Sequence, residues 1–339
     1  MLDPQTPVQR QRGAPGLRRR WFAALTLATL APLGCHATSK VIAVPISSWP
    51  GYEDLGLVAS FGVDRRHGLT LDVVQYPDPQ AIVHAYLRGD QPVAPLTTVE
   101  AVDLCERVPE RCPVVVLVLD ESRGADQLAV RNDVPSLKDL RGRTIAVTFS
   151  TLGPYVVDRA LDQLGMEIPD VNLRNMPLDR MASALASGEV AAAAFFPPYS
   201  ERAVQDARSR VMFTSREIPG EIFDVLVVDP AYLRSHATEV MLLLRSWQEA
   251  HDIAARQPER ARRLMAQREQ TSVAAFTASE QGLVYFPLAE QKAMLRPDGL
   301  IARNLERVQA VQHHIGLSHT GAPRPPVTDR LVTLALQQK

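Results

Sequence analysis

Short apolar runs alternate with amphipathic stretches along most of this chain of 339 residues. The runs have the length of β-strands, whereas the stretches between them repeat apolar residues at helical spacing. Strands are expected at 41–46, 71–75, 92–95, 114–119, 144–148, 171–175, 191–196 and 222–228. Strands that alternate with helices in this way predict an α/β fold, with a mostly parallel sheet and helices on both of its faces.

The stretches between the runs are expected to form helices, and longer helical patterns follow the last run. The expected helices are 55–67, 81–88, 99–107, 137–140, 154–164, 180–186, 237–256, 259–268, 288–295 and 300–315. The length of 339 residues exceeds that of one typical domain, which is roughly 100 to 150 residues. We therefore expect two α/β units.

The first 34 residues have the composition of an export signal. Five arginines precede an apolar run of 14 residues, Trp21–Gly34. A membrane-spanning helix needs about 20 apolar residues, whereas a signal peptide needs a basic region and about 7 to 15 apolar residues. The alternative, a buried N-terminal helix, would have to pack five arginines at one end. Residues 1–34 thus predict a signal peptide and a periplasmic or cell-envelope location.

The three cysteines suggest two further features. Leu33-Gly34-Cys35 resembles the end of a bacterial lipobox, which implies a lipid on Cys35 and a lipid anchor in the membrane. Cys105 and Cys112 enclose six residues that include Pro109, a residue that favours turns. In the oxidising compartment that export implies, we expect these two cysteines to form a disulfide, and the alternative is two separate buried thiols.

Charge and motif content exclude several function classes. Lys and Arg total 37 and Asp and Glu total 38, so no basic field is available for nucleic acid. The sequence lacks Walker A, GxSxG and HExxH motifs. His313 and His314 are neighbours in an expected helix and point in different directions, which disfavours joint metal binding. We therefore expect no catalytic residue, no metal and no cofactor.

Seven sequence blocks occur in the order and spacing of one family. The blocks are 48–53, 62–69, 87–90, 120–126, 136–147, 187–190 and 218–228. Over roughly residues 41 to 300 they resemble substrate-binding proteins of the nitrate/sulfonate/taurine class of ABC importers. The resemblance implies a two-lobed type II periplasmic binding protein fold with a ligand cleft between the lobes. Lobe one would comprise 40–131 plus 223–335, and lobe two 132–222.

The resemblance also implies a function. A monomeric, non-enzymatic receptor would capture a small polar organic ligand by hinge closure and deliver it to an ABC permease and its ATPase. A sulfonate, a zwitterion or an amine-bearing heterocycle is expected as the ligand. One alternative is an enzyme of the pyrimidine-precursor synthase type, which shares the fold but needs a reactive histidine and a cofactor lysine in the cleft. Another is a sensory receptor for a membrane kinase.

The ligand-binding residues are expected in the loops that follow the strands, because open α/β sheets bind ligands at the carboxyl ends of their strands. The candidates are Ser48, Trp49, Tyr52, Thr97, Thr98, Ser150 and Thr151. Thr98 and Thr151 also lie at expected helix starts, where backbone N–H groups favour an anionic group. The alternative role of such hydroxyls is ordinary helix capping.

Aromatic and acidic residues complete the expected site. Trp49 and Tyr52 would form one apolar wall, and Phe196 and Tyr199 the facing wall, although single aromatic residues commonly belong to the core. Acidic residues near the expected lobe crossovers would receive an amino group or a heteroaromatic cation, or serve as solvated hinge charges. They are Asp120, Glu121, Asp126, Glu221 and Asp224. With both halves of the site in place, a zwitterion or amine-bearing heterocycle fits better than nitrate.

Overall fold

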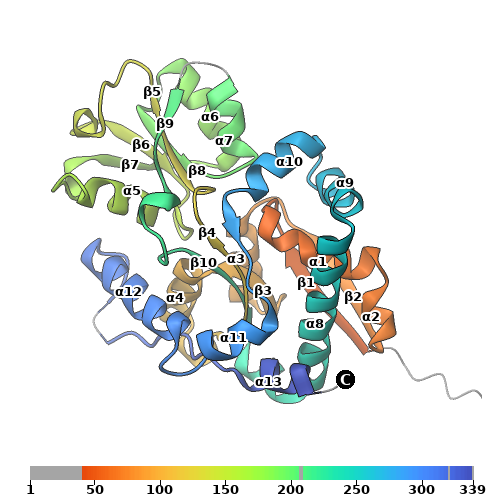
Figure 1. Cartoon of the computed structure of the whole chain (residues 1–339). Helices are drawn as coiled ribbons and strands as arrows, with labels where there is room; N and C mark the ends of the chain where they lie inside the picture. The colour runs from red at the N-terminus through yellow and green to blue at the C-terminus, as the bar shows by residue number, and fades with distance from the viewer. Residues whose placement is uncertain (1–39, 206–208, 320, 338–339) are drawn as a thin grey trace, which may run out of the picture. The chain divides into compact units, whose positions relative to one another are not determined.

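The computed structural model describes residues 40–205, 209–319 and 321–337. The expected signal peptide and Cys35 lie outside the described residues. Within the described residues, helices surround two groups of strands (Figure 1).

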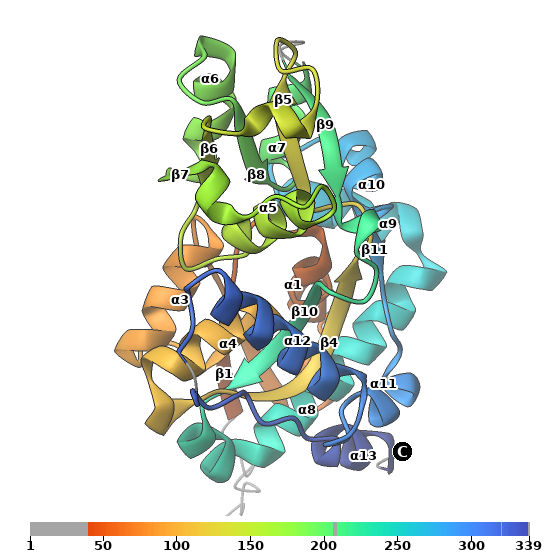
Figure 2. The same cartoon turned by 90° about the vertical axis from the view of Figure 1, so that its left-hand side faces the viewer.

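The first group combines strands from both ends of the described chain. β1 (Lys40–Ile46) pairs in parallel with β2 (Leu69–Gln75). A four-stranded sheet has the order β11-β4-β10-β3. Its strands are β11 (Leu283–Val284), β4 (Val114–Ser122), β10 (Phe223–Val228) and β3 (Val93–Thr97). β10 runs antiparallel to both β3 and β4, and Figure 2 shows β4 and β10 side by side.

The second group is a five-stranded sheet of order β7-β6-β8-β5-β9. Its strands are β7 (Asn172–Asn175), β6 (Thr144–Val147), β8 (Ala192–Phe195), β5 (Gln127–Arg131) and β9 (Ser209–Thr214). β6 is parallel to β7 and β8, whereas β5 is antiparallel to β8 and β9.

The helices divide between the two groups of strands. The helices with the second sheet are α5 (Gly153–Asp162), α6 (Leu178–Ser187) and α7 (Tyr199–Gln205). The remaining helices are α1 (Glu53–Ser60), α2 (Val63–Arg66), α3 (Pro79–Arg88), α4 (Thr98–Arg107), α8 (Pro230–Arg256), α9 (Pro258–Arg268), α10 (Val273–Glu280), α11 (Leu288–Met294), α12 (Leu300–His314) and α13 (Arg330–Gln337). Through the part of the chain described here, none of the helices has both the length and the apolar character that a bilayer span requires.

The α/β prediction is confirmed, and each expected strand run overlaps a strand of the structure. The expectation of a mostly parallel arrangement is wrong, because β5 and β10 pair antiparallel with their neighbours. The reason is the chain path: β4 leads into β5 in the second sheet, and β9 leads back into β10. A chain that leaves a sheet and returns beside its point of exit runs in the opposite direction.

The division of the chain into lobes at residues 131 and 223 stays a prediction. Sheet pairing places β5 with β8 and β9, so by sheet membership Gln127–Arg131 belongs with the second group. The segments 123–126 and 215–222 then connect the two groups of strands.

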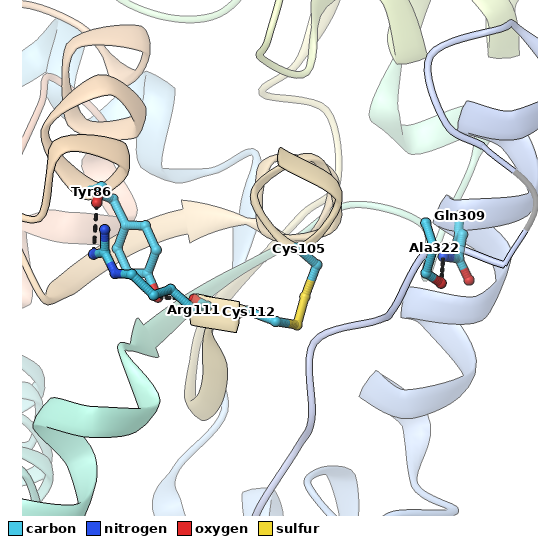
Figure 3. The surroundings of a disulfide bond; sticks show 6 residues. All are labelled: Tyr86, Cys105, Arg111, Cys112, Gln309 and Ala322. Atoms are coloured by element: carbon cyan, nitrogen blue, oxygen red, sulfur yellow. Dashed lines mark hydrogen bonds between the residues drawn. A yellow bond between two sulfur atoms is a disulfide. The ribbon is translucent and has the colours of Figure 1, made fainter. Parts of the chain in front are cut away.

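Cys105 and Cys112 are joined by a disulfide between α4 and the segment before β4 (Figure 3). Their Cα atoms are 4.1 Å apart. In the same loop the Arg111 guanidinium donates to the carboxylate of Asp229, and the Tyr86 hydroxyl donates to the Arg111 carbonyl. The bridge thus closes a loop that is also fixed by an ion pair to the start of α8. Its presence in the exported protein stays a prediction that non-reducing peptide mapping tests.

Candidate functional site

A cavity lies between the two groups of strands and is lined from both sides. The first group and the crossing segment contribute Trp49, Tyr52, Pro79, Thr97, Glu100, Asp126 and Asp224. The second contributes Thr148, Thr151, Leu152, Gly153, Val156, Leu178, Ala194, Phe195 and Phe196. The free space is about 30 Å³, which is room for one or two water molecules. The two sides are therefore closed upon each other in this structure.

The aromatic residues meet across the cavity. The Trp49 and Phe196 rings pack edge to face with centroids 5.4 Å apart, and the Trp49 and Tyr52 centroids are 6.5 Å apart. Trp49 is 4% exposed, so it is buried by partners from both sides. Tyr199 packs edge to face on Phe196 at 5.7 Å but does not line the cavity, and its hydroxyl donates to the Pro77 carbonyl.

The turn after β1 has a glycine because no side chain fits there. A Cβ atom at Gly51 would lie 1.7 Å from Asp120 Oδ2 and 2.8 Å from Trp49 Nε1. The absence of a side chain lets Trp49 Nε1 donate to Asp120 Oδ2 at 3.2 Å. The turn 50–52 therefore orients the Trp49 ring against a buried carboxylate of β4.

Asp120 and Asp224 form a cross-strand pair of carboxyl groups. They face each other in the register of β4 and β10, and both are buried. The Tyr52 hydroxyl donates to Asp224 Oδ1 at 2.5 Å. Burial raises the pKa of both carboxyl groups. The charge of Asp120 raises the pKa of Asp224 further, whereas a hydrogen bond from Asp224 acts against the rise for Asp120. Asp224 lines the cavity, whereas Asp120 lies behind Trp49.

Two further carboxyl groups line the cavity. Glu100 belongs to α4, where its side chain and that of Thr97 form a capping box. Asp126 stands in the segment that connects β4 to β5. Both are buried, and burial raises the pKa of each to about 7. Together with Asp224 they make this side of the cavity acidic.

The hydroxyl groups expected to bind an anion have other partners. Thr97 Oγ1 accepts the N–H of Glu100, as a helix cap does. Thr151 donates to the Thr148 carbonyl, and Thr148 donates to the Met176 carbonyl. For these residues the structure gives capping and turn roles. Ser48, Thr98 and Ser150 do not line the cavity.

The cavity thus brings together six of the candidate residues. They are Trp49, Tyr52, Thr97, Thr151, Phe196 and Asp224. Their role in binding stays a prediction. The candidate set lacked Glu100, because a capping-box glutamate indicates a helix start rather than a site. Asp126 was expected only as one of several acidic residues near the lobe crossovers, and the structure places it in the lining.

Three residue types common in catalytic and metal sites do not occur in the described lining. None of the lining residues is His, Lys or Cys. In the described residues, no group of three or more His, Cys, Asp or Glu side chains is arranged to hold a metal ion.

Comparisons with known proteins place the chain in a family. The model of the NMT1-like family matches residues 53–268. A protein of Brucella abortus (strain 2308) named "Putative binding protein" is 24% identical over 184 residues. That match covers 54% of this chain and 56% of the relative, so the similarity spans about half the length of the curated relatives.

Two solved structures share the fold. The periplasmic aliphatic sulphonate binding protein SsuA of Escherichia coli has a TM-score of 0.67 at 15% identity, and the match covers 86% of this chain and 91% of SsuA. The desulfurization enzyme DSZB has a TM-score of 0.62 at 18% identity, with coverages of 88% and 99%. The predicted periplasmic binding protein fold is confirmed, and this fold serves binding proteins and at least one enzyme. Since the family model covers more than half of its length, the chain belongs to the NMT1-like family.

Proposed function

We propose that the chain is an exported solute-binding protein that captures a small polar organic molecule in this cavity and delivers it to an ABC permease. The observation that supports this most directly is the cavity itself, which residues from both groups of strands enclose. Only about 30 Å³ is free, so a ligand enters when the two sides separate. Ligand contacts from both sides then favour the closed form, which the permease recognises.

The connections between the sides suit a hinge. The segments 123–126 and 215–222 connect the sheets. Single hydrogen bonds cross the cleft, and opening of the cleft can break them. Gln80 Nε2 donates to the Phe149 carbonyl at 2.9 Å, and Ser279 Oγ donates to Glu201 Oε1 at 2.8 Å. The hinge positions are part of the proposal.

A binding role is favoured over catalysis by the lining. A pyrimidine-precursor synthase would need a reactive histidine and a cofactor lysine, and the lining residues include neither. SsuA and the Brucella protein are named as binding proteins, whereas DSZB shows that the fold also supports chemistry.

Export, lipidation of Cys35, a monomeric state and an ATPase partner complete the proposal and rest on sequence. The exported protein would be attached to the cell envelope through Cys35. Intact-mass analysis of membrane fractions is expected to find a lipid-modified N-terminal Cys35. An unmodified protein cleaved at another residue would contradict lipidation and leave export intact.

The binding function is tested without knowledge of the ligand. The purified exported protein is incubated with a metabolite extract and separated from unbound molecules by gel filtration. Denaturation is expected to release one small molecule in about equal amount to the protein. Addition of that molecule is expected to raise the melting temperature, because a ligand of the folded state stabilises it. Retention of no molecule would contradict the proposed function.

A further inference from the structure

The carboxylates around the cleft fall into two sets. Outside the cavity lining, Nε and Nη2 of Arg123 each donate a hydrogen bond of 2.9 Å to the Glu121 carboxylate. Glu221 accepts Arg159 Nε at 2.9 Å and the Tyr155 hydroxyl at 3.0 Å. Guanidinium groups thus compensate these carboxylates at the crossover.

The carboxylates of the cavity have no such cation. Glu100, Asp126 and Asp224 line it, and no described lining residue is Lys, Arg or His. In the described part of the chain, Asp126 Oδ2 and Asp224 Oδ2 are buried and accept no hydrogen bond from an N–H or a hydroxyl group. Asp224 also hydrogen-bonds Asp120 when one of these two carboxyl groups is protonated, so Asp126 is the carboxyl group that most lacks a partner. Asp126 is 3% exposed and Asp224 is 1% exposed.

Buried carboxylate oxygens without partners cost free energy unless a donor or a cation reaches them. Protonation is one remedy, and the raised pKa values of Asp126 and Glu100, each about 7, agree with it. A positively charged ligand is the other remedy. An anion such as a sulfonate would add a like charge to this lining, and like charges in a low-dielectric site repel strongly.

The aromatic side chains fit an organic cation rather than a metal ion. Trp49, Tyr52 and Phe196 line the cavity beside the carboxyl groups. Aromatic faces attract ammonium and guanidinium groups and pack against an apolar body. The described residues contain no group of His, Cys, Asp and Glu side chains arranged as metal ligands.

We propose that the ligand of this cavity is an organic cation, and that Asp126 and Asp224 bind its protonated amine, amidine or guanidine group beside Trp49 and Tyr52. This inference rests on the proposed solute-binding function and names its ligand class. Trp49 and Tyr52 already donate to Asp120 and Asp224, which holds the carboxylates and the rings in place before binding. The free oxygens of Asp126 and Asp224 accept the N–H groups of the cation.

The test uses pairs of probes that share a body and differ in charge. Benzamidine is compared with benzenesulfonate, and butylamine with butanesulfonate, by calorimetry on the exported protein at pH 8.5, where the carboxyl groups with pKa values of about 7 are ionised. The cation of at least one pair is expected to bind about tenfold or more tightly than its sulfonate. Tighter binding of a sulfonate would overturn the inference and leave the solute-binding function standing.

Two variants locate the binding. Asp126→Asn is expected to lower the affinity for the cation about tenfold or more, since it removes one charged acceptor and keeps the shape of the side chain. Asp72→Asn, at an exposed position of β2, is the matched control and is expected to change nothing. Equal affinity in Asp126→Asn and the unchanged protein would overturn the inference. The melting temperature of each variant without probe shows that it is folded.

If no probe of either pair binds, the molecule released from the metabolite extract tests whether the ligand is a cation. A released molecule with a positively charged nitrogen at neutral pH supports the inference. A neutral or anionic molecule overturns it while the solute-binding function stands. Retention of no molecule contradicts the solute-binding function, and the inference fails with it.

Discussion

The two walls of the cavity differ in chemistry. The wall from the first group of strands and the crossing segment carries the carboxyl groups of Glu100, Asp126 and Asp224. The wall from the second group is formed mainly by apolar side chains, such as Val156 and Phe195. Under the proposed function, charge recognition is concentrated on one side, and the other side supplies the apolar surface that covers the ligand. The difference between the walls then predicts that the charged wall determines the class of ligand and the apolar wall its shape.

The largest expected effect compares one residue from each wall. Asp224→Asn is expected to lower the affinity for the molecule that the exported protein retains by about 100-fold, because it removes a buried charged acceptor. Val156→Ala removes only apolar contact and is expected to cost about tenfold or less. Calorimetric titration of both variants measures the difference. Similar losses in the two variants would remove the distinction between the walls.

The second prediction compares two glycines. At Gly51 an added Cβ would overlap Asp120 Oδ2, so Gly51→Ala must break the contact between Trp49 and Asp120. We expect a loss of about 2 kcal/mol in unfolding free energy and a loss of binding. At Gly153, the first residue of α5, the nearest atom would be Val147 Cβ at 3.1 Å, and Gly153→Ala is expected to cost about 1 kcal/mol or less. Chemical denaturation measures the unfolding free energy of both variants. A larger loss in Gly153→Ala than in Gly51→Ala would contradict this prediction.

The third prediction separates the cleft from the core. Trp49 is covered by residues of both walls, whereas Trp247 of α8 is fully buried within one group of elements. Trp247→Ala is expected to lower the unfolding free energy by about 3 to 5 kcal/mol. Trp49→Ala is expected to lower it less, because the open form exposes this ring, and to weaken ligand affinity about tenfold or more. Equal destabilisation by both variants, measured by thermal unfolding without ligand, would assign Trp49 to the core.

The smallest expected effect concerns pH. The pKa of Asp126 is raised by burial to about 7, and the carboxyl groups of Glu100, Asp120 and Asp224 face it, while the Ser122 hydroxyl lies in hydrogen-bond range. The folded state therefore binds the proton more tightly than the unfolded state, and stability falls as pH rises from about 4 to about 7. Asp126→Asn is expected to raise the melting temperature by a few degrees at pH 8 and to change it little at pH 5.

A compensated carboxylate supplies the control for the pH measurement. Glu221 is paired with Arg159 and Tyr155, so Glu221→Gln is expected to lower the melting temperature at pH 8. Opposite signs for Asp126→Asn and Glu221→Gln confirm that the two sets of carboxylates differ in compensation. A loss of stability in both variants at pH 8 would show that Asp126 is compensated as well.

The sequence predicts the elements better than their pairing. Alternating apolar and amphipathic segments depend on local spacing, and strands such as β4 and β10 have continuous apolar runs because they are buried on both faces. Strand direction depends on the path of the chain through the crossing segments, which local spacing does not contain. β5 and β9 were missed for a related reason: their residues are mixed in polarity, and pairing with each other and with β8 stabilises them as strands.

The site could be predicted only in part. Trp49 and Tyr52 follow the first strand, and the rule for carboxyl ends of strands locates them. The pairing of Asp120 with Asp224 depends on the register of two strands that are far apart in sequence, and that register is set by tertiary structure. Glu100 has two roles at once, as a capping residue and as part of the lining, and its sequence pattern indicates only the first.

The missing side chain at position 51 constrains how relatives of this chain can diverge. A residue with a Cβ at this position fits only if the side chain at position 120 becomes shorter, because the two would occupy the same space. Position 120 in turn supplies the acceptor for the indole of Trp49. Substitutions at positions 49, 51 and 120 should therefore co-vary among homologues, and a lineage that shortens the side chain at position 120 becomes free to replace the glycine.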